Sequence, residues 1–91
     1  MLEDLSSAVA NFAEWQAPWR FADSVRESLR SEASRVVFEA AWGAALASDH
    51  WTSDDLSACA AQAESALREA FPAFPRHVTA AIVRAAAYQW R

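Results

Sequence analysis

The most hydrophobic stretch of the chain, residues 34–47, carries apolar side chains around nearly the whole circumference of a helix. It reads SRVVFEAAWGAALA, and Arg35 and Glu39 are its only charged residues. A helix that is apolar nearly all round belongs inside a fold rather than on its surface, and Ala has the best intrinsic helix propensity. We therefore expect this stretch at the centre of the molecule. Gly43 costs roughly 1 kcal/mol against Ala there, so we expect it to allow the close approach of another helix.

The polar positions extend this helical pattern toward the amino end. Four of them follow one another at spacings of three and four: Ser28, Glu32, Arg35 and Glu39. The helix has two candidate starts: Pro18 as its first residue, or a capping box formed by Ser24 and Glu27. Because apolar residues keep the helical spacing on both sides of Ser24, we choose one long helix over residues 19–48, with room for a bend near Ser24 or Ser28.

Three further segments have one-sided apolar patterns typical of helices, over residues 2–15, 53–71 and 75–90. The first begins with two acids, which suit a helix amino end, and stops before Pro18. Thr52 is the expected N-cap of the second. The third has two apolar faces, more than one helix contact needs: Val78, Ala81, Ile82 and Ala85 on one, and Val83, Ala86, Ala87 and Trp90 on the other.

These patterns predict an all-α fold, a compact four-helix bundle with a long central second helix and short joints that contain the prolines at positions 18, 72 and 75. The length of 91 residues predicts a single helical domain over residues 1–91. No run of about 18 apolar residues occurs, so we expect no membrane-spanning helix. The acidic start is unlike a secretory signal, and one Cys suits a reducing compartment. We therefore expect a cytoplasmic protein.

The apolar content exceeds what one small core needs to bury. Hydrophobic residues make up 54% of the chain and aromatic residues 12%, including five Trp. A chain of this length buries roughly 60–65% of its unfolded surface, and large exposed apolar patches mark interfaces. We therefore expect a protein partner, or assembly into a homodimer or a higher homo-oligomer.

The charge is small overall and unevenly distributed. The net charge of −4 argues against general nucleic-acid binding. Residues 72–91 hold three Arg and no acid, so this side of the last helix can bind an acidic partner or face the acidic helices of its own fold. Aromatic residues at helix ends and joints can anchor an interface. The resulting partner-binding candidates are Trp15, Trp19, Arg76, Arg84, Tyr88, Trp90 and Arg91.

The reactive side chains lack the spacing that catalysis or metal binding requires. His50, Cys59 and His77 do not form the short pairs that hold zinc, such as C-x-x-C. Cys59 lies on the apolar stripe of its segment, where a cysteine usually packs as a small core residue. Gly43 is the only glycine, so there is no glycine-rich phosphate loop. We expect no enzyme, no metal and no cofactor.

No motif identifies a family. The Ala-rich final helix, which ends in Tyr88-Gln89-Trp90-Arg91, is slightly similar to the last helix of phage head–tail connector proteins, over less than a fifth of the chain. We expect a small non-enzymatic protein-binding module, such as a bacterial or phage-borne inhibitor, immunity, anti-defence or adaptor protein. One alternative is a connector-like structural subunit of a homo-oligomer. A second alternative is nucleic-acid binding through the Arg-bearing C-terminal helix, which the acidic net charge makes less favourable.

Overall fold

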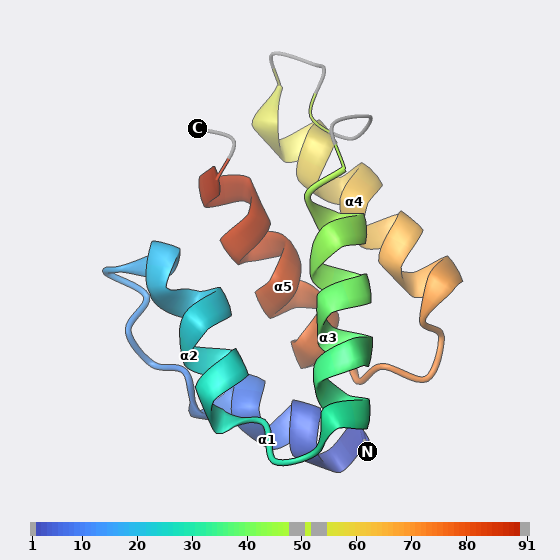
Figure 1. The fold of residues 1–91 in the computed structure, drawn as a ribbon. Coiled ribbons are helices and arrows are strands. Elements are labelled where there is room, and N and C mark those ends of the chain that lie inside the picture. Colours follow the sequence, from blue (N-terminus) through green and yellow to red (C-terminus); the bar gives the residue numbers. More distant parts are fainter. Residues whose placement is uncertain (1, 48–50, 52–54, 90–91) are drawn as a thin grey trace.

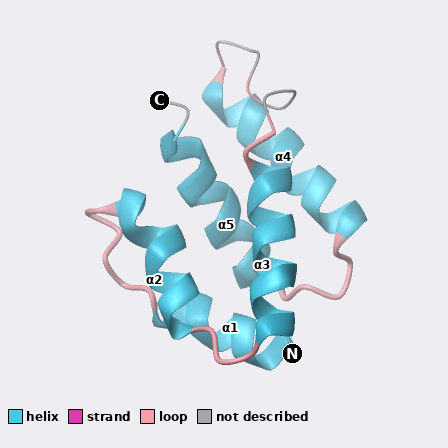
Figure 2. Ribbon diagram, viewed as in Figure 1, coloured by secondary structure: helices cyan, strands magenta, loops and turns pink. Residues whose placement is uncertain are grey.

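All regular structure in the described part of the chain is helical (Figure 2). The computed structural model describes residues 2–47, 51 and 55–89. Its elements are α1 (Leu2–Asn11), the short 3₁₀-helix η1 (Pro18–Arg20), α2 (Phe21–Ser28), α3 (Glu32–Ala45), α4 (Leu56–Ala70) and α5 (Arg76–Gln89). The predicted all-α class is confirmed.

The long second helix predicted over residues 19–48 is wrong, because the chain breaks between α2 and α3. Leu29 is extended, with φ −72° and ψ 131°. Ser31 then caps α3, and its Oγ accepts a hydrogen bond from the Ser34 N–H at 3.1 Å. From α1, Asp4 Oδ2 accepts the backbone N–H groups of Arg30 at 2.9 Å and of Ser31 at 3.3 Å. These bonds satisfy donors that a continuous helix would have bonded within itself.

Other helix ends differ from the sequence-based bounds by a few residues. The first helix ends at Asn11 rather than Trp15. The connection to η1 contains a turn, in which the Ala17 N–H donates a hydrogen bond to the Glu14 carbonyl oxygen at 2.8 Å. Asp55 caps α4, because its Oδ1 accepts the N–H groups of the second and third residues that follow it. Thr52, the predicted cap, lies outside the described residues.

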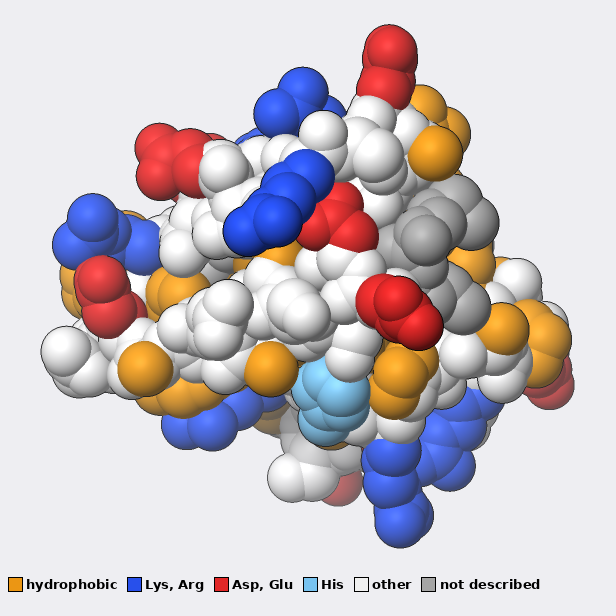
Figure 3. Space-filling view, turned by 90° about the horizontal axis from the view of Figure 1, so that it is seen from below, with side chains coloured by type: hydrophobic (Ala, Val, Ile, Leu, Met, Phe, Trp, Pro, Cys, Tyr) orange, Lys and Arg blue, Asp and Glu red, His pale blue; other side chains and the backbone are white. Residues whose placement is uncertain are grey.

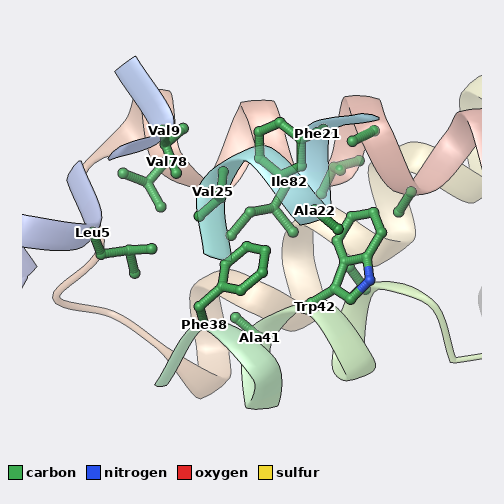
Figure 4. Close-up of a cluster of buried hydrophobic side chains, with 14 of the residues drawn as sticks. Leu5, Val9, Phe21, Ala22, Val25, Phe38, Ala41, Trp42, Val78 and Ile82 are labelled. Atoms are coloured by element: carbon green, nitrogen blue, oxygen red, sulfur yellow. The ribbon is translucent and has the colours of Figure 1, made fainter. Parts of the chain in front are cut away.

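The last helix, and not the second, is the central one. In Figure 1, α1 crosses the lower end of the molecule, and α3 and α5 rise from it side by side. The neighbours of α5 are α1, α3, α4 and η1. Both apolar faces predicted for this segment are used, because Val78, Ile82, Ala85 and Ala86 are fully buried and Val83 nearly so. In Figure 4, Phe21, Phe38 and Trp42 surround Ile82 of α5.

Aromatic rings from three parts of the chain form one cluster. Phe21, at the start of α2, lies 5.3 Å from Phe12, 5.6 Å from Trp15 and 5.9 Å from Trp42, measured between ring centroids. Phe38 and Trp42 stack on α3. The core therefore uses most of the aromatic surface that the composition suggested for an interface. The large hydrophobic side chains that remain exposed in the described part are Trp19, Val36 and Tyr88.

The sequence predicts that another helix approaches closely at Gly43, but no described helix lies against it. It is exposed on α3, and a Cβ atom built there has no neighbouring heavy atom within 4 Å. Among the described residues, the prediction of a close helix approach at this glycine is therefore wrong.

Candidate functional site

A groove between α1 and α5 is the main surface feature that contains residues predicted to bind a partner. Its volume is about 320 Å³. Because α1 and α5 pack together, their neighbouring faces and the turn after α1 form its walls. The lining is apolar apart from one His and one Arg, and contains no carboxylate: Val9, Ala10, Phe12, Trp15, His77, Ala80, Ala81 and Arg84.

Arg84 and Trp15 meet at one end of this groove. The guanidinium carbon of Arg84 lies 4.1 Å from the centroid of the Trp15 ring, which is a cation–π contact. Trp15 itself is half-buried and packs against the core. Within the described part of the chain, Arg84 forms no ion pair, although its side chain is exposed. The sequence left open whether this side of the last helix binds a partner or faces the acidic helices of its own fold; in the structure Arg84 contacts an aromatic ring that follows α1.

His77 joins the same two helices at the other end of the groove. Its Nε2 lies 3.0 Å from Ser6 Oγ and 3.4 Å from the Ser6 carbonyl oxygen on α1. The residues from His77 to Arg84 cover two turns of α5, or about 10 Å along the helix axis. The groove is therefore an elongated surface with an imidazole at one end and a guanidinium at the other.

The other predicted partner-binding residues do not gather here. Arg76 lies in a different hollow, beside Arg68 and Phe74, on the side of α5 that faces α4. Trp19 is 62% exposed and lines a polar hollow with the acids Glu14, Asp23 and Glu27. Tyr88 is exposed and follows Arg84 by one helical turn. Trp90 and Arg91 lie outside the described residues.

Three of the seven arginines in the described part of the chain form ion pairs with carboxylates. Arg26 bonds both carboxylate oxygens of Glu39, at 2.6 and 2.9 Å, and reaches Asp23 at 3.2 Å. The hydrogen bonds with Arg26 lower the pKa of Glu39, and in return they raise the pKa of Arg26. Arg20 pairs with Glu14, and Arg68 pairs with Glu64 as the i,i+4 spacing predicted. Arg84 differs from these three in its aromatic partner.

A larger hollow, of about 470 Å³, lies where α1 meets the α2–α3 break, and sequence reasoning missed it. Its lining is mostly polar: Glu3, Asp4, Ser7, Ala8, Asn11, Ser28, Arg30 and Ser31. The backbone N–H of Arg30 lowers the pKa of the Asp4 carboxyl. Asp4 thus has a structural role at the joint before α3, where it accepts two backbone N–H groups. The spacing Ser31-x-x-Ser34 was the available sequence signal for this joint.

The described residues give no support for a metal or nucleophile site. No group of three His, Cys, Asp or Glu side chains that could hold an ion was found in this part of the chain. The thiol of Cys59 is buried on α4, 3% exposed, as its place on the apolar stripe predicted. His50 lies outside the described residues. Every buried side-chain nitrogen and oxygen of the described residues has a hydrogen-bond partner.

The surface around α1 has no single dominant patch. Figure 3 shows acidic and basic side chains interspersed on the face seen from below, with hydrophobic side chains scattered among them. Among the helices of the described residues, none combines the length and the hydropathy that crossing a membrane requires.

Comparison with known proteins gives no relative from which a function could be transferred. No protein-family model matches the chain, and no significant match was found among curated proteins or solved structures. The function must therefore be argued from the residues themselves.

Proposed function

We propose that this protein is a small non-enzymatic protein-binding module whose binding surface is the groove between α1 and α5. The observation that carries the proposal is the position of Arg84, which stacks on Trp15 beside an apolar groove and has no carboxylate partner among the described residues. Trp, Tyr and Arg are the residues that most often dominate the binding energy of protein interfaces. Tyr88 extends the same side of α5 by one turn.

The arrangement also limits the cost of binding. Stacking on Trp15 holds a long, flexible side chain in place before a partner arrives, so less side-chain entropy is lost on association. The half-buried ring is in turn fixed by its contacts with Phe12 and Phe21. A bacterial or phage-borne inhibitor, immunity factor or adaptor, acting in the cytoplasm, is the type of protein that we infer.

The test is a pull-down from a lysate of the source cells, with matched charge reversals on one helix. Arg84→Glu changes the groove, whereas Arg76→Glu makes the same chemical change on another face of α5. We expect the wild-type protein and Arg76→Glu to retain one foreign protein in stoichiometric amount, and Arg84→Glu to lose it. Circular dichroism and urea unfolding of all three proteins establish that they are folded.

Two results would contradict the proposal. If both variants retained the foreign protein equally, the binding face would lie elsewhere. The same would follow if both variants lost it equally. Recovery of the protein by itself, as a large defined oligomer, would instead support a structural role.

A homo-oligomeric structural subunit is the second candidate, and the outer face of α3 favours it. Val36 is 63% exposed there. Ala33, Ala40 and Gly43 are exposed at helical spacings from it, so the face lacks charge along its centre. Light scattering of the purified protein tests this role. A defined oligomer that Val36→Glu dissociates would support it, and a monomer at high concentration would exclude it.

A further inference from the structure

We propose that the α1–α5 groove takes an acidic amphipathic helix, with apolar side chains in the groove and a carboxylate on the Arg84 guanidinium. This inference rests on the proposed function and names the chemistry of the partner. Its first support is charge complementarity, because the groove lining holds one Arg, one His and no acid. Since nothing within the described residues neutralises Arg84, an incoming carboxylate meets a cation without an existing ion pair.

The geometry of the Arg84–Trp15 contact leaves the guanidinium available to a carboxylate. The guanidinium carbon lies 4.1 Å over the centroid of the Trp15 ring, so the ring covers one side of the group, and the side chain is otherwise exposed. The N–H groups lie in the guanidinium plane, where a carboxylate binds through two parallel hydrogen bonds. A lysine at this position would offer neither the flat face nor the paired donors.

The shape and size of the groove fit a helix better than a compact small molecule. Its volume of about 320 Å³ is at the lower end for ligand pockets. Its lining extends over two turns of α5, from His77 to Arg84. A bound helix presents apolar side chains at i, i+3, i+4 and i+7 over the same distance. The floor consists of small Ala side chains beside Val9 and Phe12, which lets the partner backbone come close.

The neighbouring hollow beside Trp19 provides an internal contrast. It is lined by Glu14, Asp23 and Glu27 with a single Arg, and that Arg is already paired with Glu14. An acidic segment is therefore repelled from the Trp19 side of η1 and attracted to the Arg84 side.

The experiment uses two designed helical peptides as probes. Both carry Leu and Ala at i, i+3, i+4 and i+7, and their remaining positions are Glu in one and Lys in the other. Binding is followed in ¹⁵N NMR spectra of the full chain, through the indole N–H of Trp15 and the Nε–H of Arg84. We expect saturable shifts of both signals with the Glu peptide only, and weakening of the interaction as salt is raised.

The charge reversals sharpen the test. Arg84→Glu should weaken binding of the Glu peptide by roughly tenfold or more and should create binding of the Lys peptide, whereas Arg76→Glu should leave both results nearly unchanged. Equal binding of both peptides, absence of saturable shifts with the Glu peptide, or an equal effect of the two variants would overturn the inference. Shifts produced by a DNA duplex but not by the Glu peptide would assign the groove to phosphates and overturn it as well.

Different results would refute the proposed protein-binding function and the proposed acidic helical partner. A cellular partner that requires Arg84 but binds through a basic or neutral segment would preserve the proposed function and refute the acidic helix. Conversely, selective binding of the Glu peptide without any partner in the lysate would support the chemistry of the groove and count against the proposed function.

Discussion

Asp4 illustrates how one half-buried side chain links a helix to the start of another that is distant in sequence. Its Oδ2 accepts two backbone N–H groups at the start of α3, and the bond from Arg30 lowers its pKa below the ordinary value near 3.8. A carboxyl whose pKa is lower in the folded than in the unfolded state stabilises the fold above its unfolded pKa. This contribution is lost as the pH falls through the lower, folded value.

Replacing Asp4 with Asn should therefore make stability less dependent on pH in the acid range. We expect Asp4→Asn to unfold at a lower urea concentration than the wild type at pH 7, because the charged acceptor is gone. The difference should shrink as the pH falls below about 4. Glu3→Gln is the control, since Glu3 lies beside Asp4 in the first turn of α1 and caps no other helix in the described contacts. Identical pH profiles for the two variants would contradict the capping role.

Gly43→Ala should stabilise the protein by about 1 kcal/mol. Glycine costs this much in a helix interior, and the new Cβ meets no heavy atom within 4 Å. Urea unfolding of the variant and the wild type measures the difference in their free energies of unfolding. Ala40→Gly, at another exposed position of α3, should cost about the same amount. A loss of stability in Gly43→Ala would mean that a second molecule occupies the space beside α3.

At the scale of helices, the ion pair between Arg26 and Glu39 links α2 to α3 across the break. The two side chains form two hydrogen bonds, but they are 40% and 47% exposed, so water screens the pair. In a double-mutant cycle with alanine we expect a coupling of up to about 1 kcal/mol. The pair of Glu64 and Arg68 within α4 should give about 0.3–0.5 kcal/mol. Equal couplings would show that the bidentate geometry adds nothing.

The pattern of apolar residues predicts which segments are helical, but near Ser28 it allows only a bend in one long helix, where the structure has a break between α2 and α3. No proline or glycine marks residues 29–31, and Leu29 continues the apolar spacing, because its side chain remains buried after the backbone has left the helix. At the break, backbone N–H groups bond to Asp4, which is 26 positions away from Arg30 in sequence. A contact of this kind overrides local propensity and cannot be inferred from one helix alone.

The same limit applies to the candidate site. Spacing correctly places Arg84 and Tyr88 near one another on the last helix, and composition identifies Trp15 as a candidate. Which of the aromatic residues meets the arginine depends on how the turn after α1 folds back onto α5. For this reason the sequence grouped Arg76 and Trp19 with Arg84, and the structure places each of them in a different hollow.

For the stability of the whole molecule, Phe21 is the residue whose substitution by alanine should cost most. It is fully buried and lies within 6.3 Å of four other aromatic rings, two from the segment that follows α1 and two from α3. We expect Phe21→Ala to cost about 3–5 kcal/mol, a large part of the 5–15 kcal/mol that usually holds a domain together. Trp19→Ala removes a larger ring that is mostly exposed, so its effect on the urea midpoint should be small.

Because the central helix is the last one in the sequence, the order of synthesis matters to this fold. Val9 and Val78 lie side by side in Figure 4, yet 69 positions separate them along the chain (78 − 9). At about 5–20 residues per second, a ribosome needs roughly 3–14 s to extend the chain from one to the other. During that interval the apolar side of α1 has no α5 to cover it. We expect the nascent chain to need protection from aggregation and proteolysis in that interval, however stable the finished protein is.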